Sequence, residues 1–204
     1  QWRGEELRSY AERTQRCVDQ ARQRVLEGVA VPNQEKIFSL YEPHTELIIR
    51  GKAGKEVEFG HMVEIHQVAE GLITGYQTHV RRPAEAELVV PAVRAHKAIF
   101  GRVPKVCATD KGFYSQETLT DVKEMGVKTV AIPKKGLRNA AQTRQEHSIL
   151  FKLAQRFRAG IEAAVSYLKR VFGLDRCMQE GFSRFESWGG TGVFAHNLVL
   201  LAHG

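Results

Sequence analysis

The positions of apolar residues along the chain predict amphipathic helices near both ends. Residues 5–27 repeat them at intervals of three and four with charged residues between, which is typical of a helix with one buried face, and Gly28 ends it. Residues 142–172 repeat the pattern over a longer stretch that Gly173 ends, and a last helix is expected at 189–202. The apolar positions of the longer stripe are Ile149, Leu150, Leu153, Phe157, Ile161, Ala164, Val165, Leu168, Val171 and Phe172.

The segments that follow the first helix do not repeat their apolar residues at helical intervals. Residues 36–42 are brief and rich in β-forming side chains, which predicts a strand. Glycines and lysines interrupt any regular period in residues 45–60, which predicts a loop. Residues 61–80 contain two apolar runs about Glu70 and Gly71, and this pattern predicts a hairpin.

The middle of the chain alternates between the two periods. Residues 84–99 are expected to be helical, with Pro91 kinking or interrupting the helix. Residues 103–109 predict a strand, residues 115–126 a helix that begins with a serine cap, and residues 127–133 another strand. This order implies a parallel pair joined by a right-handed crossover. We therefore expect an α/β fold whose mixed sheet has an antiparallel hairpin and then a parallel β-α-β unit, with helices packed on it.

Composition narrows the class of protein. A chain of 204 residues with 43% hydrophobic residues can bury a core, and no apolar run is long enough to cross a bilayer. Cys17, Cys107 and Cys177 form no C-x-x-C pair, which argues against a disulfide framework or a zinc knuckle and favours a reducing cytoplasm. The net charge of +7 and the pI near 9.5 favour a polyanionic partner, above all nucleic acid.

The start of the chain raises a separate expectation. It has neither an initiator methionine nor a basic-then-apolar signal pattern. We therefore expect the sequence to begin inside a longer reading frame.

Asp110 is the first candidate for chemistry. It follows the predicted strand 103–109, and ligands bind at the carboxyl ends of parallel strands. Gly112 then permits the sharp exit that a backbone passing over a metal or a phosphate needs. The other interpretation is an Asx turn that only ends the strand, and this stretch alone favours the turn.

Glu162 changes the balance between these interpretations. It lies one position past Ile161, at the edge of the predicted buried face of the long helix, where its carboxylate can lean toward the end of the sheet. Gly160 costs about 1 kcal/mol against alanine inside a helix, which would make sense if the helix approaches the sheet closely there. The alternative is an ion pair with Arg158 four residues earlier, and both interpretations can hold together.

An aspartate on a strand and a glutamate on a later helix suit hard divalent metals, which take oxygen ligands. Two such ions about 3.5–4 Å apart can activate the attacking oxygen and stabilise the leaving oxygen of a phosphoryl displacement. Such a site needs a further carboxylate on a neighbouring strand. None of the other aspartates ends such a strand, and Glu42 is the only internal stand-in.

The histidines show no ligand spacing for zinc, and His61 and His66, five apart on a predicted strand, would point to opposite faces. Basic residues flank the candidate carboxylates in sequence, and each group of them is either a solvated face or a set of phosphate contacts. The candidate DNA-binding residues are Lys52, Lys55, Lys134, Lys135, Arg158, Lys169 and Arg176.

At these residues the sequence resembles the C-terminal part of insertion-sequence DDE transposases with an RNase H-like catalytic core, closest to the ISNCY-like group. The resemblance covers roughly residues 35–202 in the family's order. The matching stretches are "KIFSLYEPHTELIIRGKAGKEVEFGHMVEI", "ATDKGFYS", "VAIPKKG", "RAGIEAAVSYLKRVFGLDRC" and "FAHNLVLLA".

The resemblance implies that Asp110 is the second and Glu162 the third acidic residue of a catalytic triad. The first would lie upstream of Gln1. It further implies two Mg²⁺ or Mn²⁺ ions, with Asp110 as a ligand and Glu162 binding the second ion or positioning the nucleophile. Residues 1–33 would be a helical segment inserted in the core, and residues 34–204 would be an N-terminally incomplete RNase H-like domain.

The implied chemistry is DNA transposition. Water and then a DNA 3′-hydroxyl would attack phosphodiester bonds of double-stranded DNA, at the element ends and at the target. The protein would act in the cytoplasm as a homo-oligomer assembled on DNA, without a membrane. Because the first acidic residue is absent, one alternative is an inactive remnant that binds DNA or full-length subunits. A weaker alternative is another two-metal nuclease.

Overall fold

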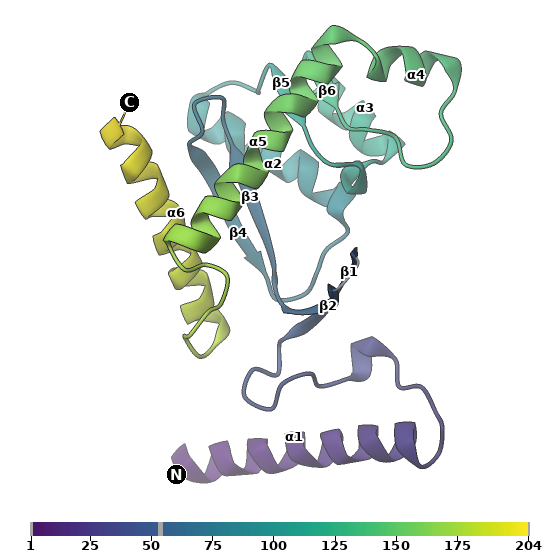
Figure 1. The fold of residues 1–204 in the computed structure, drawn as a ribbon, viewed down its shortest axis with the longest axis vertical. Helices are drawn as coiled ribbons and strands as arrows, with labels where there is room; N and C mark the ends of the chain where they lie inside the picture. The colour runs from purple at the N-terminus through teal and green to yellow at the C-terminus, as the bar shows by residue number, and fades with distance from the viewer. Residues whose placement is uncertain (1, 53–54, 204) are drawn as a thin grey trace. The chain divides into compact units, whose positions relative to one another are not determined.

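The structure, a computed structural model, describes residues 2–52 and 55–203. In the described residues, a long helix is followed by two pairs of strands, a second helix, a β-α-β unit and three further helices (Figure 1). The chain divides into two compact units by its internal contacts. The first unit comprises residues 1–62, 78–82 and 178–186, and the second comprises residues 63–77, 83–177 and 187–204.

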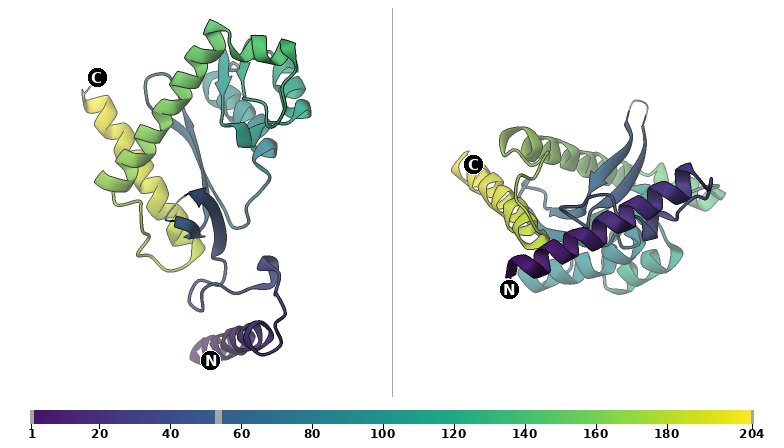
Figure 2. Two further views of the ribbon diagram at one scale, coloured as in Figure 1. Left: turned by 45° about the vertical axis from the view of Figure 1, so that its right-hand side comes forward. Right: turned by 90° about the horizontal axis from the view of Figure 1, so that it is seen from below.

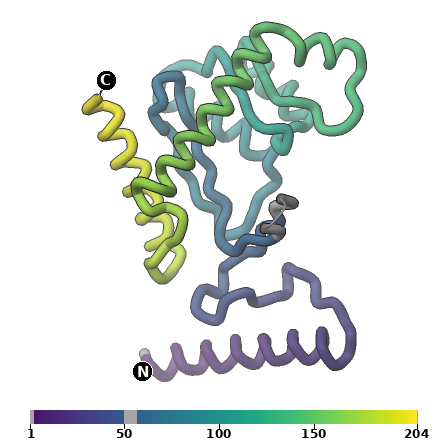
Figure 3. The backbone as a smooth tube through the Cα atoms, viewed as in Figure 1, coloured from purple at the N-terminus to yellow at the C-terminus, as the bar shows by residue number. Residues whose placement is uncertain are grey.

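The first unit begins with helix α1 (Trp2–Val25), which confirms the predicted N-terminal helix. An irregular segment containing the short helix η1 (Asn33–Glu35) then returns along α1, as the backbone trace shows (Figure 3). Polar side chains of α1 hold this segment: Arg13 donates to the carbonyl oxygen of Leu40 at 2.6 Å, and Gln20 accepts from the backbone N–H of Ile37 at 2.7 Å.

The strand predicted at 36–42 is wrong, because this stretch is irregular. Its peptide groups bond to side chains of α1 instead of a neighbouring strand. The side-chain amide of Gln20, for example, also donates to the carbonyl oxygen of Ile37 at 3.3 Å.

The loop predicted at 45–60 is also wrong. Strands β1 (Glu46–Lys52) and β2 (Lys55–Gly60) form an antiparallel pair in this segment. Its register sets Leu47 opposite Phe59 and Ile49 opposite Val57, and cross-strand pairs of this kind stabilise a sheet. The glycines and lysines of residues 51–55 interrupt the apolar period in the sequence, and they led to the prediction of a loop.

Strands β3 (Met62–Gln67) and β4 (Ile73–His79) confirm the predicted hairpin. Gly71 adopts a positive φ of 84° in the connecting turn, a conformation that glycine adopts without strain. The side-chain amide of Asn197 then fixes the hairpin to the last helix, because it accepts from the N–H of Ile73 at 2.9 Å and donates to its carbonyl oxygen at 2.8 Å.

The predicted helix at 84–99 consists of a 3-10 turn, η2 (Glu85–Leu88), and helix α2 (Val89–Phe100). Pro91 lies in the first turn of α2, where its missing N–H costs no helical hydrogen bond. The proline therefore marks the start of the α-helix and does not kink it. Gly101, with a φ of 67°, ends it.

The β-α-β unit follows, as predicted. Strand β5 (Val106–Ala108) pairs in parallel with β6 (Thr129–Ala131), and helix α3 (Gln116–Glu124) lies between them in the chain. Ser115 caps α3 by accepting from the N–H of Thr118 at 3.1 Å, which confirms the serine cap.

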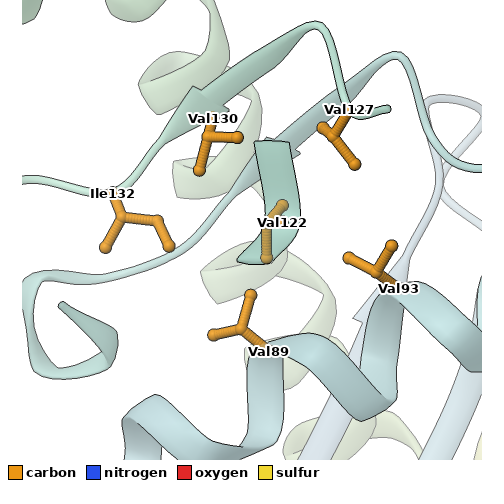
Figure 4. Packing of buried hydrophobic residues seen from close by; sticks show 6 residues of the cluster. All are labelled: Val89, Val93, Val122, Val127, Val130 and Ile132. Atoms are coloured by element: carbon orange, nitrogen blue, oxygen red, sulfur yellow. The ribbon is translucent and has the colours of Figure 1, made fainter. Parts of the chain in front are cut away.

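The main hydrophobic core of the second unit joins α2, α3 and the strand β6 region (Figure 4). Val122 is fully buried at its centre, and burial of each such side chain contributes roughly 1.5–3 kcal/mol. This packing gives β5 and β6 a fixed support on one side. The core consists of Val89, Val93, Val122, Val127, Val130 and Ile132.

The long helix predicted at 142–172 is two helices, α4 (Ala140–Glu146) and α5 (Ile149–Val171). Ser148 separates them and caps α5 by accepting from the N–H of Phe151 at 3.3 Å. Figures 1 and 2 show α5 passing the β5–β6 pair and continuing toward the last helix.

The last helix, α6 (Phe182–His203), begins seven residues before the predicted start at residue 189. The glycines at its centre serve close packing. A Cβ at Gly192 would lie 2.6 Å from Cδ1 of Leu174, and one at Gly189 would clash with the hydroxyl of Tyr76.

These elements confirm the mixed α/β fold, with antiparallel strands before a parallel β-α-β unit and flanking helices. Within the described residues the strands pair two by two. No helix in the described part of the chain is long and apolar enough to span a membrane.

Candidate functional site

Asp110 lies just beyond the carboxyl end of β5, as expected. Its backbone is extended, and it caps the short helix η3 (Lys111–Phe113) because its Oδ1 accepts from the N–H of Lys111 at 2.7 Å. The carboxylate is exposed. This bond goes to the next residue and not to the one after it, so it is an N-cap bond and not the Asx turn considered from the sequence. It fixes one carboxylate oxygen, and the side chain remains exposed.

Gln155 of α5 fixes the strand ends beside Asp110. Its side-chain amide nitrogen donates to the carbonyl oxygen of Thr109 at 3.1 Å and to that of Ala131 at 2.6 Å. These carbonyls belong to the ends of the two parallel strands, and Thr109 immediately precedes Asp110. No sequence pattern indicates a role for this residue, since a helical glutamine is usually solvated.

The first half of α5 rests on the strand pair through small residues. Phe151 and Ala154 are buried and pack with Ala131 and Ala108. The predicted stripe is wrong in this half of the helix, because Ile149, Leu150, Leu153 and Phe157 are exposed. Because these alanines are small, the face of α5 that carries Phe151 and Ala154 can pack closely on the strands. The larger apolar side chains next to that face remain exposed to solvent.

Glu162 lies on α5 with its side chain 70% exposed, and Arg158 pairs with it at 3.0 Å between Nη1 and Oε1. The ion-pair interpretation is therefore confirmed, whereas the expected position at the edge of the buried face is wrong for this exposed side chain. The Arg158 side chain is only 25% exposed, and its buried Nε has no hydrogen-bond partner among the described residues. A partly buried arginine thus orients the carboxylate.

Gly160 does not mark a close approach of α5 to the sheet. A Cβ added at this residue would have no atom within 4 Å outside its own helix backbone. The expectation based on its helix cost is therefore wrong, since the residue faces open space.

Helix geometry relates the two candidate carboxylates. Gln155 and Glu162 are seven residues apart, which places them on one side of α5, about 20° apart in angle and about 10.5 Å apart along the axis. Asp110 adjoins the residue that Gln155 contacts. Lys169 lies a further seven residues along this same stripe and is exposed. One side of α5 therefore carries Gln155, Arg158, Glu162 and Lys169.

The donor chemistry of this edge fits a hard divalent cation only in part. Asp110 and Glu162 both offer exposed carboxylate oxygens, the ligands that Mg²⁺ prefers. Within residues 2–52 and 55–203, however, no three His, Cys, Asp or Glu side chains gather as a metal site would require. The described residues thus contain two candidate ligands and show no complete metal site.

Glu42 is engaged elsewhere. In the first unit its carboxylate contacts Nε2 of His44 at 3.0 Å and accepts from the N–H of Gly181 at 2.7 Å. His44 stacks on His61 with a ring separation of 4.8 Å. Burial, and then the charge of His44, lower the pKa of His61 below its usual range.

The candidate basic residues differ in how free they are. Lys134 is tied into its own loop, because its Nζ donates to Oε1 of Gln142 at 2.9 Å and its N–H to Oε1 of Glu146 at 2.9 Å. Lys135, Lys169 and Arg176 are exposed. Lys52 and Lys55 are register partners in β1 and β2, and their side chains lie outside what the structure describes.

Comparison with known proteins gives one match. The family model described as "Transposase DDE domain" matches residues 50–198. This range contains every element from β2 to α5 and both candidate carboxylates. No curated protein matches the chain, and no solved structure matches it.

Proposed function

The chain belongs to the transposase DDE domain family, and on this premise we propose that it cleaves double-stranded DNA and joins the ends to a target, with Asp110 and Glu162 as its catalytic carboxylates. The family supports a transposition-related nuclease that binds DNA and generally uses divalent metal ions. The ISNCY-like group, the helical segment 1–33 and the core 34–204 remain part of the proposal.

One observation carries the assignment of residues. Asp110 follows a parallel strand end that Gln155 ties to α5, the helix that also bears Glu162. The carboxyl ends of parallel strands are where ligands bind, and exposed carboxylates there can receive a cation. A local turn alone would explain Asp110, but it would not explain why the second candidate lies on the helix that supports the same edge.

Each residue then has a distinct part in the proposed reaction. Asp110 and Glu162 would hold Mg²⁺ or Mn²⁺, two ions in the complete site, together with a further carboxylate. When bound, the metal would neutralise charge on the phosphate and its attacking and leaving oxygens. Gln155 positions Asp110, and Arg158 orients Glu162.

The proposed reaction has two steps, hydrolysis of a phosphodiester bond and transfer of the new DNA end to the target. Water adds to a phosphodiester phosphorus and gives up a proton, and the 3′ oxygen leaves as an alkoxide that takes up a proton and becomes a hydroxyl. That hydroxyl then adds to a phosphorus of the target and gives up its proton, and the target's own 3′ oxygen leaves and is protonated in turn. Lys135, Lys169 and Arg176, all exposed, would neutralise phosphates of the approaching duplex, alongside Lys52, Lys55, Lys134 and Arg158. We further propose that the protein works in the cytoplasm, as a homo-oligomer on its DNA.

The test uses the protein expressed from its full reading frame. Asp110→Asn and Glu162→Gln should each abolish Mg²⁺-dependent nicking and joining of a labelled duplex, and removal of the metal by EDTA should do the same to the wild type. Asp121→Asn and Glu117→Gln, on helix α3, serve as matched controls. DNA binding, measured by fluorescence anisotropy, should persist in all four variants. Retained joining in either carboxylate variant would sink the assignment.

The same experiment separates the second candidate function. A wild-type protein that binds duplex DNA but never cuts it, with any divalent metal, would be a DNA-binding remnant. Cutting without joining would instead indicate another two-metal nuclease.

A further inference from the structure

We propose that Leu137, at the tip of the loop between β6 and α4, is a wedge that enters the base stack of duplex DNA bound at the Asp110 edge. This inference rests on the proposed function, because it takes the same DNA as its ligand. It adds a separate contact, with the bases instead of the phosphates.

Leu137 is unusual among the large apolar side chains of the described residues. It is 95% exposed, the highest fraction among them. Its neighbours Lys135 and Arg138 are cations, and Gly136 turns the chain there with a φ of 85°. An apolar side chain set between positive charges matches what duplex DNA offers, since phosphates attract the cations and the base stack accepts the apolar group.

The loop is braced, so that the leucine is held outward. The carboxylate of Glu146 accepts from the N–H of Lys134 at 2.9 Å and from Nε of Arg138 at 2.8 Å. Arg138 also donates to the carbonyl oxygen of Lys134 at 3.4 Å, which closes the base of the loop. A flexible loop could fold its leucine back onto the protein, whereas this one has both ends fixed to a single carboxylate.

A capping box adds a second brace. Asn139 accepts from the N–H of Gln142 at 2.8 Å, and Oε1 of Gln142 accepts in return from the N–H of Asn139 at 3.0 Å. The same oxygen accepts from Nζ of Lys134 at 2.9 Å. A preorganised wedge loses little conformational entropy when it binds, which is what a contact that unstacks bases requires.

The loop leaves the same edge of the strand pair as Asp110. Ala108 and Ala131 are register partners, Asp110 follows two residues after the first and Leu137 six residues after the second. If the two segments that lead from these partners to Asp110 and to Leu137 were fully extended in opposite directions, the two residues would still lie within about 32 Å of each other. This is less than one helical turn of DNA, about 34–36 Å, and a duplex at Asp110 can therefore reach the loop. Figures 1 and 2 show that this loop and α4 lie on the opposite side of the second unit from the C-terminal end of α6.

The probe is a duplex of about 16 base pairs with 2-aminopurine at a TA step, since pyrimidine–purine steps unstack most readily. Binding of wild-type protein should raise 2-aminopurine fluorescence severalfold. Leu137→Ala should remove most of this rise and weaken affinity about tenfold, in line with the loss of a buried leucine contact. Leu137→Phe should retain the rise, because it keeps an apolar wedge.

Two further variants test the mechanism. Leu150→Ala removes another exposed leucine, 66% exposed on α5, and should change nothing. Glu146→Ala keeps the leucine but frees the loop, and it should lower the fluorescence rise as much as Leu137→Ala does. Circular dichroism and urea unfolding verify that each variant is folded.

The outcomes are distinct. Binding with an equal fluorescence rise in wild type and Leu137→Ala, or with no rise in wild type, would overturn the wedge and leave the proposed function standing. Failure of the wild type to bind the duplex at any salt concentration would overturn both. A Lys135→Ala variant that binds more weakly, with a salt slope reduced by about one, would show that the cations act as phosphate contacts beside the wedge.

Discussion

The side-chain amide of Gln155 donates to the carbonyl oxygen of Thr109 at 3.1 Å, so that helix α5 holds the residue immediately before Asp110. The same nitrogen reaches the carbonyl oxygen of Ala131 on the neighbouring strand. One side chain thus sets the spacing of two strand ends and ties them to the helix that carries Glu162.

Gln155→Ala should therefore destabilise the protein and impair catalysis together. Ala131 is fully buried, and the loss of both hydrogen bonds is expected to lower the free energy of unfolding by about 1–3 kcal/mol. Urea unfolding measures this change, and the nicking assay should show lower activity with unchanged DNA affinity. Gln145→Ala, at an exposed position of α4, is the matched control. An unfolding midpoint equal to that of the wild type would contradict the clamp.

Gly160→Ala should stabilise the protein. Its Cβ would meet open space, and alanine is favoured over glycine in a helix interior by about 0.8–1.0 kcal/mol. Gly192→Ala should have the opposite effect, since its Cβ would lie 2.6 Å from Cδ1 of Leu174. Thermal and urea unfolding of the pair give the comparison. A loss of stability at position 160 would mean that this face of α5 is covered.

Acidification should destabilise the protein through His61. Its pKa in the folded chain lies below the usual value of 6.5, because burial and then the charge of His44 disfavour the proton. The charge of Glu46, a hydrogen bond to the backbone of His79 and the charge of Glu42 oppose this shift. The unfolded chain binds more protons between the folded pKa and 6.5, and the free energy of unfolding therefore rises with pH across that window. The stabilisation is complete above 6.5 and is lost as the pH falls through the folded pKa.

Urea unfolding between about pH 4.5 and pH 8, with about one measurement per half pH unit, tests this linkage. His61→Phe should keep the aromatic packing and flatten part of the slope. Burial, and then the charges of Arg102 and His66, lower the pKa of His96 as well. His96 therefore contributes to the pH dependence in the same direction and accounts for part of the slope that remains in His61→Phe.

Cys107 should resist alkylation in the folded protein. Burial raises the pKa of its thiol from 9.0 to about 11, and this difference cuts the reactive thiolate at pH 8 by about a hundredfold. Treatment with iodoacetamide followed by mass spectrometry measures the rate, and the same cysteine in urea is the control. Equal rates in the folded and unfolded chain would show that the thiol is not desolvated.

The β-α-β unit could be predicted from the sequence because each of its signals is local. The switch of apolar period at residues 103–133 and the Ser115 cap depend only on neighbours in the chain. The β1–β2 pair could not be predicted in this way. Its first strand has three consecutive apolar residues and no alternation, and the pairing of Leu47 with Phe59 and of Ile49 with Val57 becomes evident only from the register.

The candidate site shows the same limit. Asp110 and Glu162 could be proposed from chemistry and from the family pattern, and their assignment remains a prediction. The face of α5 could not be foreseen, because the helix packs through Ala154 against two alanines and leaves Leu153 and Phe157 exposed. Gln155 was missed for a related reason, since its role exists only once two strand ends lie beneath it.

The shortness of β5 and β6 has a consequence for motion. Each strand is three residues long, which leaves few backbone hydrogen bonds to keep the pair closed. The Asp110 edge is therefore held chiefly by packing and by the Gln155 amide from α5. Strands held in this way open and close together with the helix above them as one cooperative unit. The two candidate carboxylates would then gain or lose their alignment in a single step, and a ligand that bridges them would slow that opening for the whole edge.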